Sequence, residues 1–593
     1  MRSKYLSKLA IICASTLFCT TIVLSGCGGE DEMHKAATSL AYSTGINAEG
    51  LYDESMFYRN DLNFVKGDFA DPGAFYCEAD GYYYVYSTDM RCVRTKDFVD
   101  FEDLGVVFTA AADAWSNNYY WAPEVIYDNS TQKYYLYYSA TAKDVTNTNW
   151  NGRHRIGIAV ADTPQGPFHE WEGTRSIPLR DEDGKRVQEN GEDVFVNEKL
   201  TKAQFPIDFM QSPVVHELGL NNFAMIDAHP FFDGDDLYLY FVHHKDDWNE
   251  TQGIWGVKMI DMVTPDYDTL TQLTEPGKKT IGGEANFEVG VTVNEAPFML
   301  SHVTKKPDGT TVKKYYLTYS IYGYSNPLYS VACAVSDSPL GAFVKLDTKD
   351  GQPILGIDSD FDHMAGTGHH SFVQCGDEYF MMYHAFSNRT NINDGRTLAF
   401  DRMTFAYNES LGYDLMYGNG PTYSLQPLPY TVTGYQNLAK DAVITADGIA
   451  DGSRASYLND GRFTINYDND FDFVSASNTV TVTIDFGKEV ALNAIMVYNG
   501  RDIYQAFSSM DVIRFESAEG NYYIDNLTFP KAYIGDGIMR PGGAAIAEFN
   551  TIKANKIVMK ITKKIAAELF PDRPDAAGVS ISEIVVLGKE ANA

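Results

Sequence analysis

One sequence pattern occurs five times along this chain, and it constrains the fold more than any other feature. It joins a short apolar run to a Tyr-rich run across a turn, first in FADPGAFYCEADGYYYVYSTD at residues 69–89. Further copies begin at Trp121, Ile226, Asn294 and, in a looser form, Gly368. Tyr, Phe and Val favour strands, whereas the Asp, Gly and Asn between the runs favour hairpin turns. Each copy is therefore predicted to form one hairpin.

The five hairpins predict a five-bladed β-propeller. Two later segments, GIAVADTPQGPF from Gly157 and VACAVSDSPLGAF from Val331, resemble each other and supply further strands. Repeated units of about four short strands are typical of propellers, in which the sheets surround a central axis. The spacing between copies is uneven, so we expect insertions between strands, such as the charged run DEDGKRVQENGEDV from Asp181.

The innermost strands of a propeller begin close to its axis, so the residues that open them converge. Here that set includes Asp71, Asp227, Glu295 and His369. Three carboxylates and an imidazole around one axis are costly to desolvate unless their charge serves a purpose. The pattern therefore indicates a functional site on the axis.

The charge of the chain limits its partners. The 593 residues carry a formal net charge of −33, which disfavours nucleic acids and anionic membrane surfaces because their phosphates would be repelled. Neutral polymers remain open as partners. The 40 tyrosines suit an all-β protein and provide flat rings for stacking on sugars. No signal for an oligomeric state is present.

The first 27 residues resemble an export signal. A basic start, MRSKYLSK, precedes an apolar stretch that ends in Leu24-Ser25-Gly26-Cys27. This ending resembles a bacterial lipobox, which would make Cys27 a lipidated first residue; an ordinary signal peptide or an uncleaved anchor is the alternative. Residues 28–58 are then expected to be a tether. The expected location is the cell surface or the periplasm, with membrane attachment only through the lipid.

Four cysteines remain after the leader. Cys77 and Cys92 flank a hairpin and could pair, whereas Cys333 and Cys375 lie in apolar strands. Small buried core residues are the favoured interpretation for all four.

The repeated pattern ends before about residue 430, after a Pro- and Gly-rich connection. We therefore divide the chain into a propeller over 59–430 and a second domain over 433–593. Segments such as NTVTVTIDFG, LNAIMVYNG and ISEIVVLG predict an antiparallel β-sandwich. Their order resembles the jelly-roll, discoidin-like (coagulation factor type C) fold, which implies a carbohydrate-binding module. Tyr457, Tyr467 and Tyr504 are its candidate sugar contacts, with rim or core packing as the alternative.

The propeller resembles glycoside hydrolase family 43 through six motifs in the order of that family. All but the last open a predicted strand, and this combination is far more specific than any one motif. They are Ala70-Asp71-Pro72-Gly73, Trp121-Ala122-Pro123-Glu124, Ile226-Asp227-Ala228-His229-Pro230, Asn294-Glu295-Ala296-Pro297, Gly368-His369-His370-Ser371 and Gly395-Arg396.

The resemblance implies an inverting glycosidase with two working carboxyl groups. One carboxylate activates water and one protonated carboxyl assists the leaving oxygen, about 6.5–9.5 Å apart. It assigns Asp71 as general base, Glu295 as general acid and Asp227 as the residue that orients the acid and raises its pKa by like-charge repulsion. The alternative for each is an acid that caps a turn or strand.

Further residues receive weaker assignments from the same resemblance. Trp121 would form a wall of the sugar pocket, His229 would line it, and Arg396 would bind sugar hydroxyls; blade packing and an inter-blade ion pair are the alternatives for Trp121 and Arg396. His369 would contact a central calcium ion or its water network, with a buried core histidine as the alternative. No organic cofactor is expected. Ala296 stands where many family members have Gly after the acid.

The predicted function is hydrolysis of plant or microbial polysaccharide, or of its oligosaccharides. An α-L-arabinofuranosidase or β-xylosidase type is favoured, and a galactose- or galactofuranose-releasing glycosidase of the same family is the alternative. A glycan-capture lipoprotein without catalysis is the alternative from another class. The Arg-Asp-Pro and Glu-Cys motifs of related sucrose- and fructan-cleaving enzymes are absent from the sequence.

Overall fold

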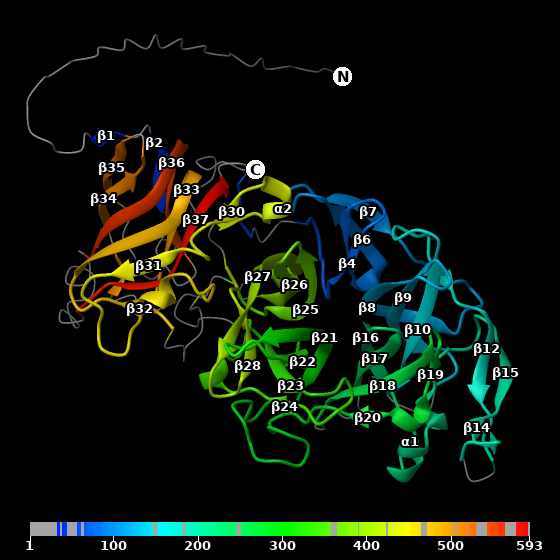
Figure 1. Ribbon diagram of the computed structural model, residues 1–593. Coiled ribbons are helices and arrows are strands. Elements are labelled where there is room, and N and C mark those ends of the chain that lie inside the picture. Colours follow the sequence, from blue (N-terminus) through cyan, green and yellow to red (C-terminus); the bar gives the residue numbers. More distant parts are fainter. Residues whose placement is uncertain are drawn as a thin grey trace, which may run out of the picture.

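The structure of the protein is a computed structural model. It describes residues 33–590 apart from 36–37, 44–55, 61–64, 146–150, 182–184, 245–250, 357–363, 389–390, 423–424, 464–470, 501, 503–504, 508, 519, 529–542 and 564–576. Nearly all regular structure is β-strand, arranged as a five-bladed propeller followed by a separate large sheet (Figure 1). The only α-helices among these described residues are α1 (Pro213–Glu217) and α2 (Tyr430–Thr433).

Each blade is an antiparallel sheet whose strands follow one another along the chain, from the axis outward. The first blade contains β4 (Gly73–Cys77), β5 (Tyr82–Ser87), β6 (Arg91–Thr95) and β7 (Glu102–Val106). The second contains β8 (Ser116–Asp128), β9 (Lys133–Ala142), β10 (His154–Ala161) and β11 (His169–Glu170). All five predicted hairpins, including those of the three blades described next, are confirmed as the two inner strands of a blade.

The other three blades have the same order of strands. The third contains β16 (Met225–Asp233), β17 (Asp236–His243), β18 (Ile254–Asp261), β19 (Thr264–Pro265) and β20 (Thr271–Gln272). The fourth contains β21 (Asn294–Lys305), β22 (Thr311–Ile321), β23 (Ser330–Ser336) and β24 (Val344–Lys345). The fifth contains β25 (Gly368–Cys375), β26 (Glu378–Phe386), β27 (Arg396–Asn408) and β28 (Tyr413–Gly418).

The Tyr-rich second strand of each blade is buried on both faces, which explains its composition. Tyr84 and Tyr86 of β5 pack toward the second blade, whereas Tyr83 and Val85 pack toward the fifth. Every pair of neighbouring blades shares one such apolar cluster. Burial of each large side chain contributes about 1.5–3 kcal/mol, so these five clusters hold the blades in a ring.

Two short strands outside the blades close the molecule. β3 (Phe57–Tyr58) pairs with β29 (Gln426–Pro427), so the segment before the first blade is fixed to the segment after the last. The Tyr58 ring also stacks on Phe400 of the fifth blade at 4.2 Å. This contact fixes the segment before the first blade to the fifth blade.

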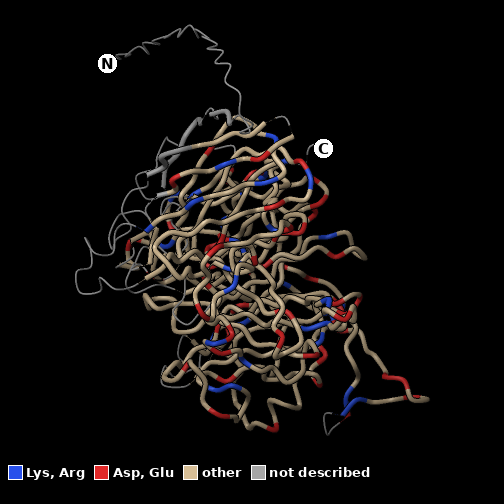
Figure 2. Tube along the Cα trace, turned by 60° about the vertical axis from the view of Figure 1, so that its left-hand side comes forward, with Lys and Arg blue, Asp and Glu red and all other residues tan. Residues whose placement is uncertain are grey.

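The charged insertion expected after residue 181 forms an arm between the second and third blades. β12 (Gly173–Pro178) pairs with β15 (Phe195–Leu200), and β13 (Gln188–Glu189) pairs with β14 (Glu192–Asp193). The arm projects from the propeller and carries charges of both signs (Figure 2). Arg186 pairs with Asp193 in the arm and with Asp266 and Asp268 of the third-blade region.

The C-terminal region forms most of one ten-stranded sheet built on two long strands. β33 (Thr479–Asn499) and β36 (Ala544–Thr562) pair along their whole length but have different outer neighbours in their two halves. Both halves contribute side chains to one apolar core. The other strands are β30 (Gln436–Asn437), β31 (Val443–Ala446), β32 (Phe473–Val474), β34 (Ser509–Glu516), β35 (Asn521–Thr528) and β37 (Ser580–Glu590).

The segment 28–58, expected to be a tether, contains strands of this same sheet. β1 (Met33–Lys35) pairs with β35, and β2 (Thr38–Ser43) pairs with β36. The chain therefore enters the propeller from the C-terminal sheet.

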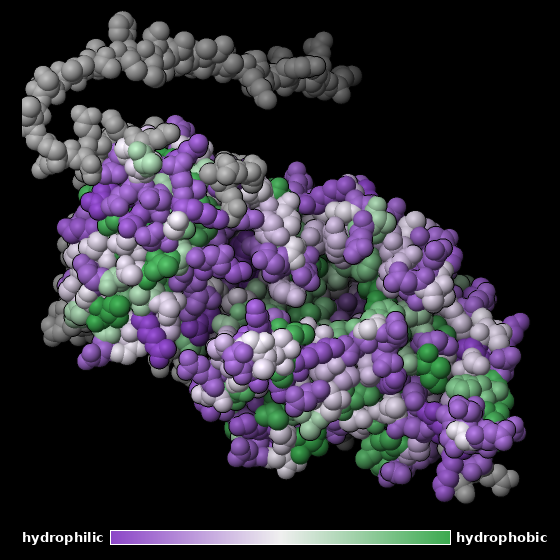
Figure 3. All heavy atoms as spheres, viewed as in Figure 1, coloured by the Kyte–Doolittle hydropathy of each residue, from purple (hydrophilic) through white to green (hydrophobic). Residues whose placement is uncertain are grey.

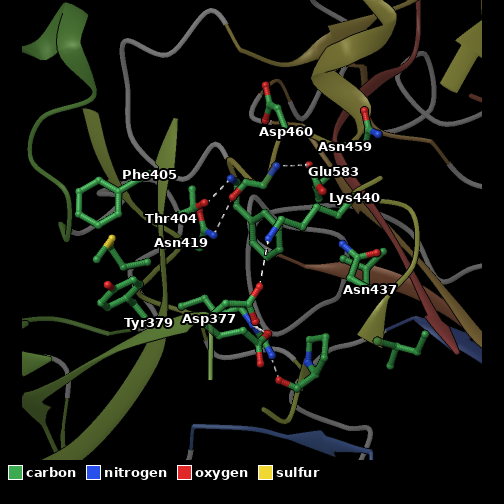
Figure 4. A pocket seen from close by; sticks show the side chains of 18 of the residues that line it. Asp377, Tyr379, Thr404, Phe405, Asn419, Asn437, Lys440, Asn459, Asp460 and Glu583 are labelled. Carbon is green, nitrogen blue, oxygen red and sulfur yellow. Dashed lines mark hydrogen bonds and ion pairs between the residues drawn. The ribbon is translucent and has the colours of Figure 1, made fainter. Parts of the chain in front are cut away.

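An apolar junction joins the sheet to the propeller. Tyr498 and its neighbours on the outer face of β33 pack against Met56, Phe57 and Leu425, and the Tyr498 ring lies 4.2 Å from Phe463. A cavity of about 310 Å³ opens beside these contacts (Figure 4). Lys440 and Asp377 face each other across it at 3.7 Å, and Glu583 accepts a hydrogen bond from the Gly461 N–H.

The structure describes the residues of one sequence-based prediction, on the four cysteines, but not those of another, on the leader. Cys77, Cys92, Cys333 and Cys375 are all free and buried, as the core interpretation predicted. The expected leader, including Cys27, lies outside the described residues. Within the described ranges, no helix is long and apolar enough to cross a membrane.

Candidate active site

Five residues with a left-handed backbone surround the axis, one from each blade. They are Asp71 (φ 55°), Ala122 (φ 46°), Asp227 (φ 56°), Ala296 (φ 52°) and His369 (φ 45°). In blades two to five the strand pairing shifts register at this residue, which is the geometry of a β-bulge. Bulges re-aim side chains, and left-handed non-glycine residues cost about 1–3 kcal/mol each. The propeller therefore holds a strained ring of residues where its inner strands begin.

The backbone N–H groups of this ring are held by side chains from neighbouring blades. The Asp71 N–H donates to His384 Nδ1 (3.1 Å) and the Ala122 N–H to Thr88 Oγ (3.2 Å). The Asp227 and His369 N–H groups donate to Ser139 Oγ (3.0 Å) and Ser320 Oγ (2.9 Å). The Ala296 N–H donates to the carboxylate of Asp227 (3.0 Å). These bonds connect the blades in a closed ring.

Asp71 lies beside one permanent cation, Arg396, and two imidazoles whose own pKa values are lowered by burial. Its Oδ1 is 3.3 Å from each of Arg396 Nη1, His369 Nδ1 and His384 Nδ1, and Thr88 donates its hydroxyl to Oδ2. Burial alone would raise the pKa of Asp71, but Arg396 and the two histidines outweigh it and hold that pKa well below its usual range. Asp71 is therefore a carboxylate at neutral pH.

Glu295 and Asp227 lie in the opposite environment. Burial, with the charge of Asp71 adding to it, raises the pKa of Glu295 to about 7. Burial and the charge of Glu295 raise the pKa of Asp227 to about 7 as well. A carboxyl group with a pKa near 7 can hold and release a proton at neutral pH. The axis thus combines an ionised carboxylate with two carboxyl groups that hold their protons up to about pH 7.

Both neighbours of Glu295 in the chain are anchored. On one side the Asn294 side chain accepts a hydrogen bond from Lys345 Nζ (2.8 Å) and donates to Glu288 (3.2 Å), within a buried Lys345–Glu288 ion pair. On the other side Ala296 is held by Asp227. Both residues that flank the acid in the chain are therefore held in place. A catalytic group works efficiently only when it is held in the right geometry toward its substrate.

Surface access to this region is visible from one side. Figure 3 shows the molecular surface hollowed in the region where Figure 1 labels β4 and β25. An ionised base and a protonated acid at one accessible site can perform general acid–base chemistry on a bound molecule.

The structure places the other predicted residues in different settings. Arg396 joins the Asp71 group and also contacts Asp68, so the ion-pair alternative describes its contacts here. Trp121 stacks on His154 at 4.6 Å and is partly buried. His229 is 5% exposed, with its ring 4.1 Å from Phe298 and its Nδ1 4.0 Å from Glu124, and burial lowers its pKa to about 3. It lies buried in β16, two residues after Asp227.

His369, expected near a central calcium ion or its water network, has its Nδ1 3.3 Å from Asp71 Oδ1. Across the described residues, no group of three or more His, Cys, Asp or Glu side chains is arranged to hold a metal ion.

Sequence reasoning missed the side chains that hold the ring. Ser139, Ser320 and His384 each follow directly on a tyrosine near the end of the second strand of a repeat, and Thr88 follows Tyr86 by two residues. This recurrence was present in the repeats and could have revealed them. The candidate Tyr457 packs on the C-terminal core between Arg454 and Arg462, whereas Tyr467 and Tyr504 lie outside the described residues.

Comparison with known proteins identifies the family. The family model described as Glycosyl hydrolases family 43 matches residues 62–186 and 210–410. This chain belongs to that family. The matched residues span the five blades and include Asp71, Asp227, Glu295, His369 and Arg396. Membership of glycosyl hydrolases family 43 supports hydrolysis of glycosidic bonds.

Individual relatives of this family 43 chain share only parts of it. It is 36% identical over 100 residues to "Xylosidase/arabinosidase 43A" of Humicola insolens, a match covering 17% of this chain and 26% of that protein. The chain thus matches about a quarter of the curated relative. A crystal structure of a thermostable family-43 glycoside hydrolase is 25% identical, with a TM-score of 0.44, and covers 62% of this chain and 99% of its own. An endo-1,4-beta-xylanase from Bacteroides thetaiotaomicron is 26% identical, with a TM-score of 0.40, and covers 59% and 94%.

Proposed function

We propose that this protein is an inverting glycoside hydrolase in which Asp71 is the general base, Glu295 the general acid and Asp227 the residue that orients the acid. One observation carries the proposal: two carboxyl groups on the same axis have their pKa values moved in opposite directions. Separated pKa values are what one acid and one base need to work at the same pH.

The proposed reaction is a single displacement at the anomeric carbon. Asp71 takes a proton from water as the water oxygen bonds to that carbon. The bond from this carbon to the leaving oxygen breaks, and Glu295 gives that oxygen its proton. One proton enters Asp71 and one leaves Glu295, so exchange with solvent restores both groups. Attack from the face opposite to the leaving group inverts the anomeric configuration.

The favoured substrate type is an α-L-arabinofuranoside or a β-xyloside. The relative named Xylosidase/arabinosidase 43A supports this choice through its 36% identity over 100 residues. Galactose or galactofuranose release is the alternative. We also propose that Trp121 and Arg396 contact the sugar, and that residues 433–593 are a discoidin-like module that binds carbohydrate. Any calcium at the axis would be held through water, and chelation by EDTA tests that contribution.

A panel of aryl glycosides tests the function directly. Aryl α-L-arabinofuranoside, β-D-xyloside, β-D-galactoside and galactofuranoside should be compared with the wild-type protein, followed by the corresponding polymers. Turnover of the arabinofuranoside or xyloside above the others is the expected result. Tight binding of glycans without turnover of any of them would favour a glycan-capture protein instead.

We further propose that the protein is a bacterial lipoprotein at the cell surface or in the periplasm. The basis is the sequence Leu24-Ser25-Gly26-Cys27. Replacement of Cys27 by Ala should release the protein from the membrane fraction with unchanged specific activity. Continued membrane retention of that variant would refute anchoring through Cys27.

A further inference from the structure

The ring of hydrogen bonds around the axis follows one rule with a single exception. In each blade, one residue at the end of the second strand lies opposite the residue that precedes the left-handed one. Ser139 lies opposite Trp121, Val242 opposite Ile226, Ser320 opposite Glu295, and His384 opposite Gly368. Thr88 corresponds to them in the first blade, because its N–H donates to the Ala70 carbonyl. Four of these five side chains accept the N–H of the left-handed residue in the next blade.

Val242 is the exception, because an isopropyl group cannot accept a hydrogen bond. The N–H that it would serve belongs to Ala296, the residue after Glu295. Asp227 accepts this N–H through its carboxylate at 3.0 Å instead. The backbone of Asp227 is itself held by Ser139 at 3.0 Å. A continuous path thus runs from the second blade to the fourth, through Ser139, Asp227 and Ala296.

We propose that Ser139 and Val242 are positioning residues for the general acid. Ser139 fixes the backbone of Asp227, and Val242 leaves the Ala296 N–H to the Asp227 carboxylate, which thereby fixes the backbone beside Glu295. The inference rests on the proposed roles of Asp227 and Glu295.

The chemistry of the acceptors supports this division of labour. A hydrogen bond to a carboxylate is stronger than one to a neutral hydroxyl. When Asp227 is ionised, the exception therefore places the strongest acceptor of the ring next to Glu295. Ser320 offers an internal comparison, because its backbone lies opposite Glu295 but its hydroxyl holds His369, which contacts Asp71 on the base side. Ser139 and Ser320 are both fully buried, so they form a matched pair.

The test compares Ser139→Ala with Ser320→Ala on two substrates that share one sugar. One substrate has a good aryl leaving group, and the other is an alkyl glycoside or an oligosaccharide. Poor leaving groups need the acid, whereas water attack needs the base with either substrate. We expect Ser139→Ala to lower kcat/KM about five- to tenfold on the poor leaving group and about twofold or less on the good one, as fits one lost hydrogen bond. Ser320→Ala should lower both by a similar factor.

Val242 gives a second test that does not depend on removing a hydroxyl. Val242→Thr keeps the shape and adds an acceptor that competes with Asp227 for the Ala296 N–H. It should reproduce the selective loss on the poor leaving group, whereas Val242→Ala, which adds no acceptor, should not. Thermal unfolding of each variant verifies that it is folded.

The outcomes separate this inference from the function beneath it. If the wild type hydrolyses no glycoside, the proposed function fails. If the wild type is active but Ser139→Ala loses equally on both substrates, or Val242→Thr behaves like Val242→Ala, the positioning role is overturned.

Discussion

Asp71 and Glu295 start from the same place in the fold and end with opposite properties. Asp71 itself has a left-handed backbone at the start of an inner strand, and Glu295 directly precedes such a residue, Ala296. Both lie at the axis. Asp71 is surrounded by Arg396, His369 and His384, whereas Glu295 faces burial and the negative charge of Asp71. The repeat provides equivalent positions, and the neighbouring blades decide which carboxyl keeps its proton.

The largest expected effect comes from removing the base. Asp71→Ala should lower kcat about 10²- to 10⁴-fold on activated and natural substrates alike, because water attack is needed whatever group departs. Steady-state kinetics on the two substrate types measure this. Azide should restore turnover by taking the place of water, with an inverted product. A variant that stays active on the activated substrate without azide would remove Asp71 from the base role.

Removing the acid should break the symmetry between substrates. Glu295→Ala should lose about 10²- to 10⁴-fold on a natural oligosaccharide and much less on an activated aryl glycoside, which departs without a proton. The ratio of the two losses is the quantity to measure. Equal damage to both substrates would contradict the assignment of Glu295 as the acid.

Substitution of Arg396 should reduce the difference between the pKa values of Asp71 and Glu295. Arg396→Met removes a permanent positive charge. That charge is the largest of the influences that lower the pKa of Asp71, whereas for Glu295 it ranks behind the hydrogen bond from Tyr329. Because the base must be ionised, the acidic limb of the kcat/KM profile should move up by on the order of one pH unit, and the alkaline limb should move less. Arg396→Lys keeps the charge and is the control. An unmoved acidic limb in Arg396→Met would show that another group sets the pKa of the base.

The smallest expected effect concerns how the stability of the protein depends on pH. The pKa of Asp227 is raised to about 7 in the folded protein, so its contribution to stability is present below its unfolded pKa of about 3.9 and is lost as the pH rises toward 7. Asp227→Asn removes this loss, and its amide oxygen can still accept the Ala296 N–H. The Tm of the variant relative to wild type should therefore increase between pH 5 and pH 8, by a few degrees.

Glu284→Gln is the matched control for that measurement, because the Glu284 side chain is 78% exposed. It should show no such pH-dependent difference. A difference for Asp227→Asn that stays flat across this pH range would mean that the carboxyl is not protonated in the folded state.

Much of this site could be predicted from the sequence because the repeat fixes which residues begin inner strands. Asp71, Asp227 and Glu295 could be brought together in this way. A raised pKa of Glu295 was expected from repulsion by Asp227, whereas its main causes in the structure are burial and the charge of Asp71. The lowered pKa of Asp71 could not be predicted, since Arg396 reaches Asp71 across 325 residues when the last blade closes on the first. The left-handed backbone of the five axial residues could not be predicted from the sequence either, because only Gly adopts that conformation without a steric cost.

The C-terminal region shows the same limit. The segments around Val480 and Ile495 were predicted as two strands, but they form halves of β33, with register shifts between Asp485 and Val490 and between Leu492 and Ala494. The pairing of β1 and β2 with this sheet was not foreseen, because their short, mixed segment resembles a tether.

The most direct test of the central claim is the configuration of the first product of the wild-type enzyme. A ¹H NMR time course on the aryl glycoside that is turned over best distinguishes the two anomers before mutarotation mixes them. An ionised Asp71 that activates water opposite a protonated Glu295 predicts that the inverted anomer forms first. If the retained anomer forms first, the single-displacement account of Asp71 and Glu295 is contradicted.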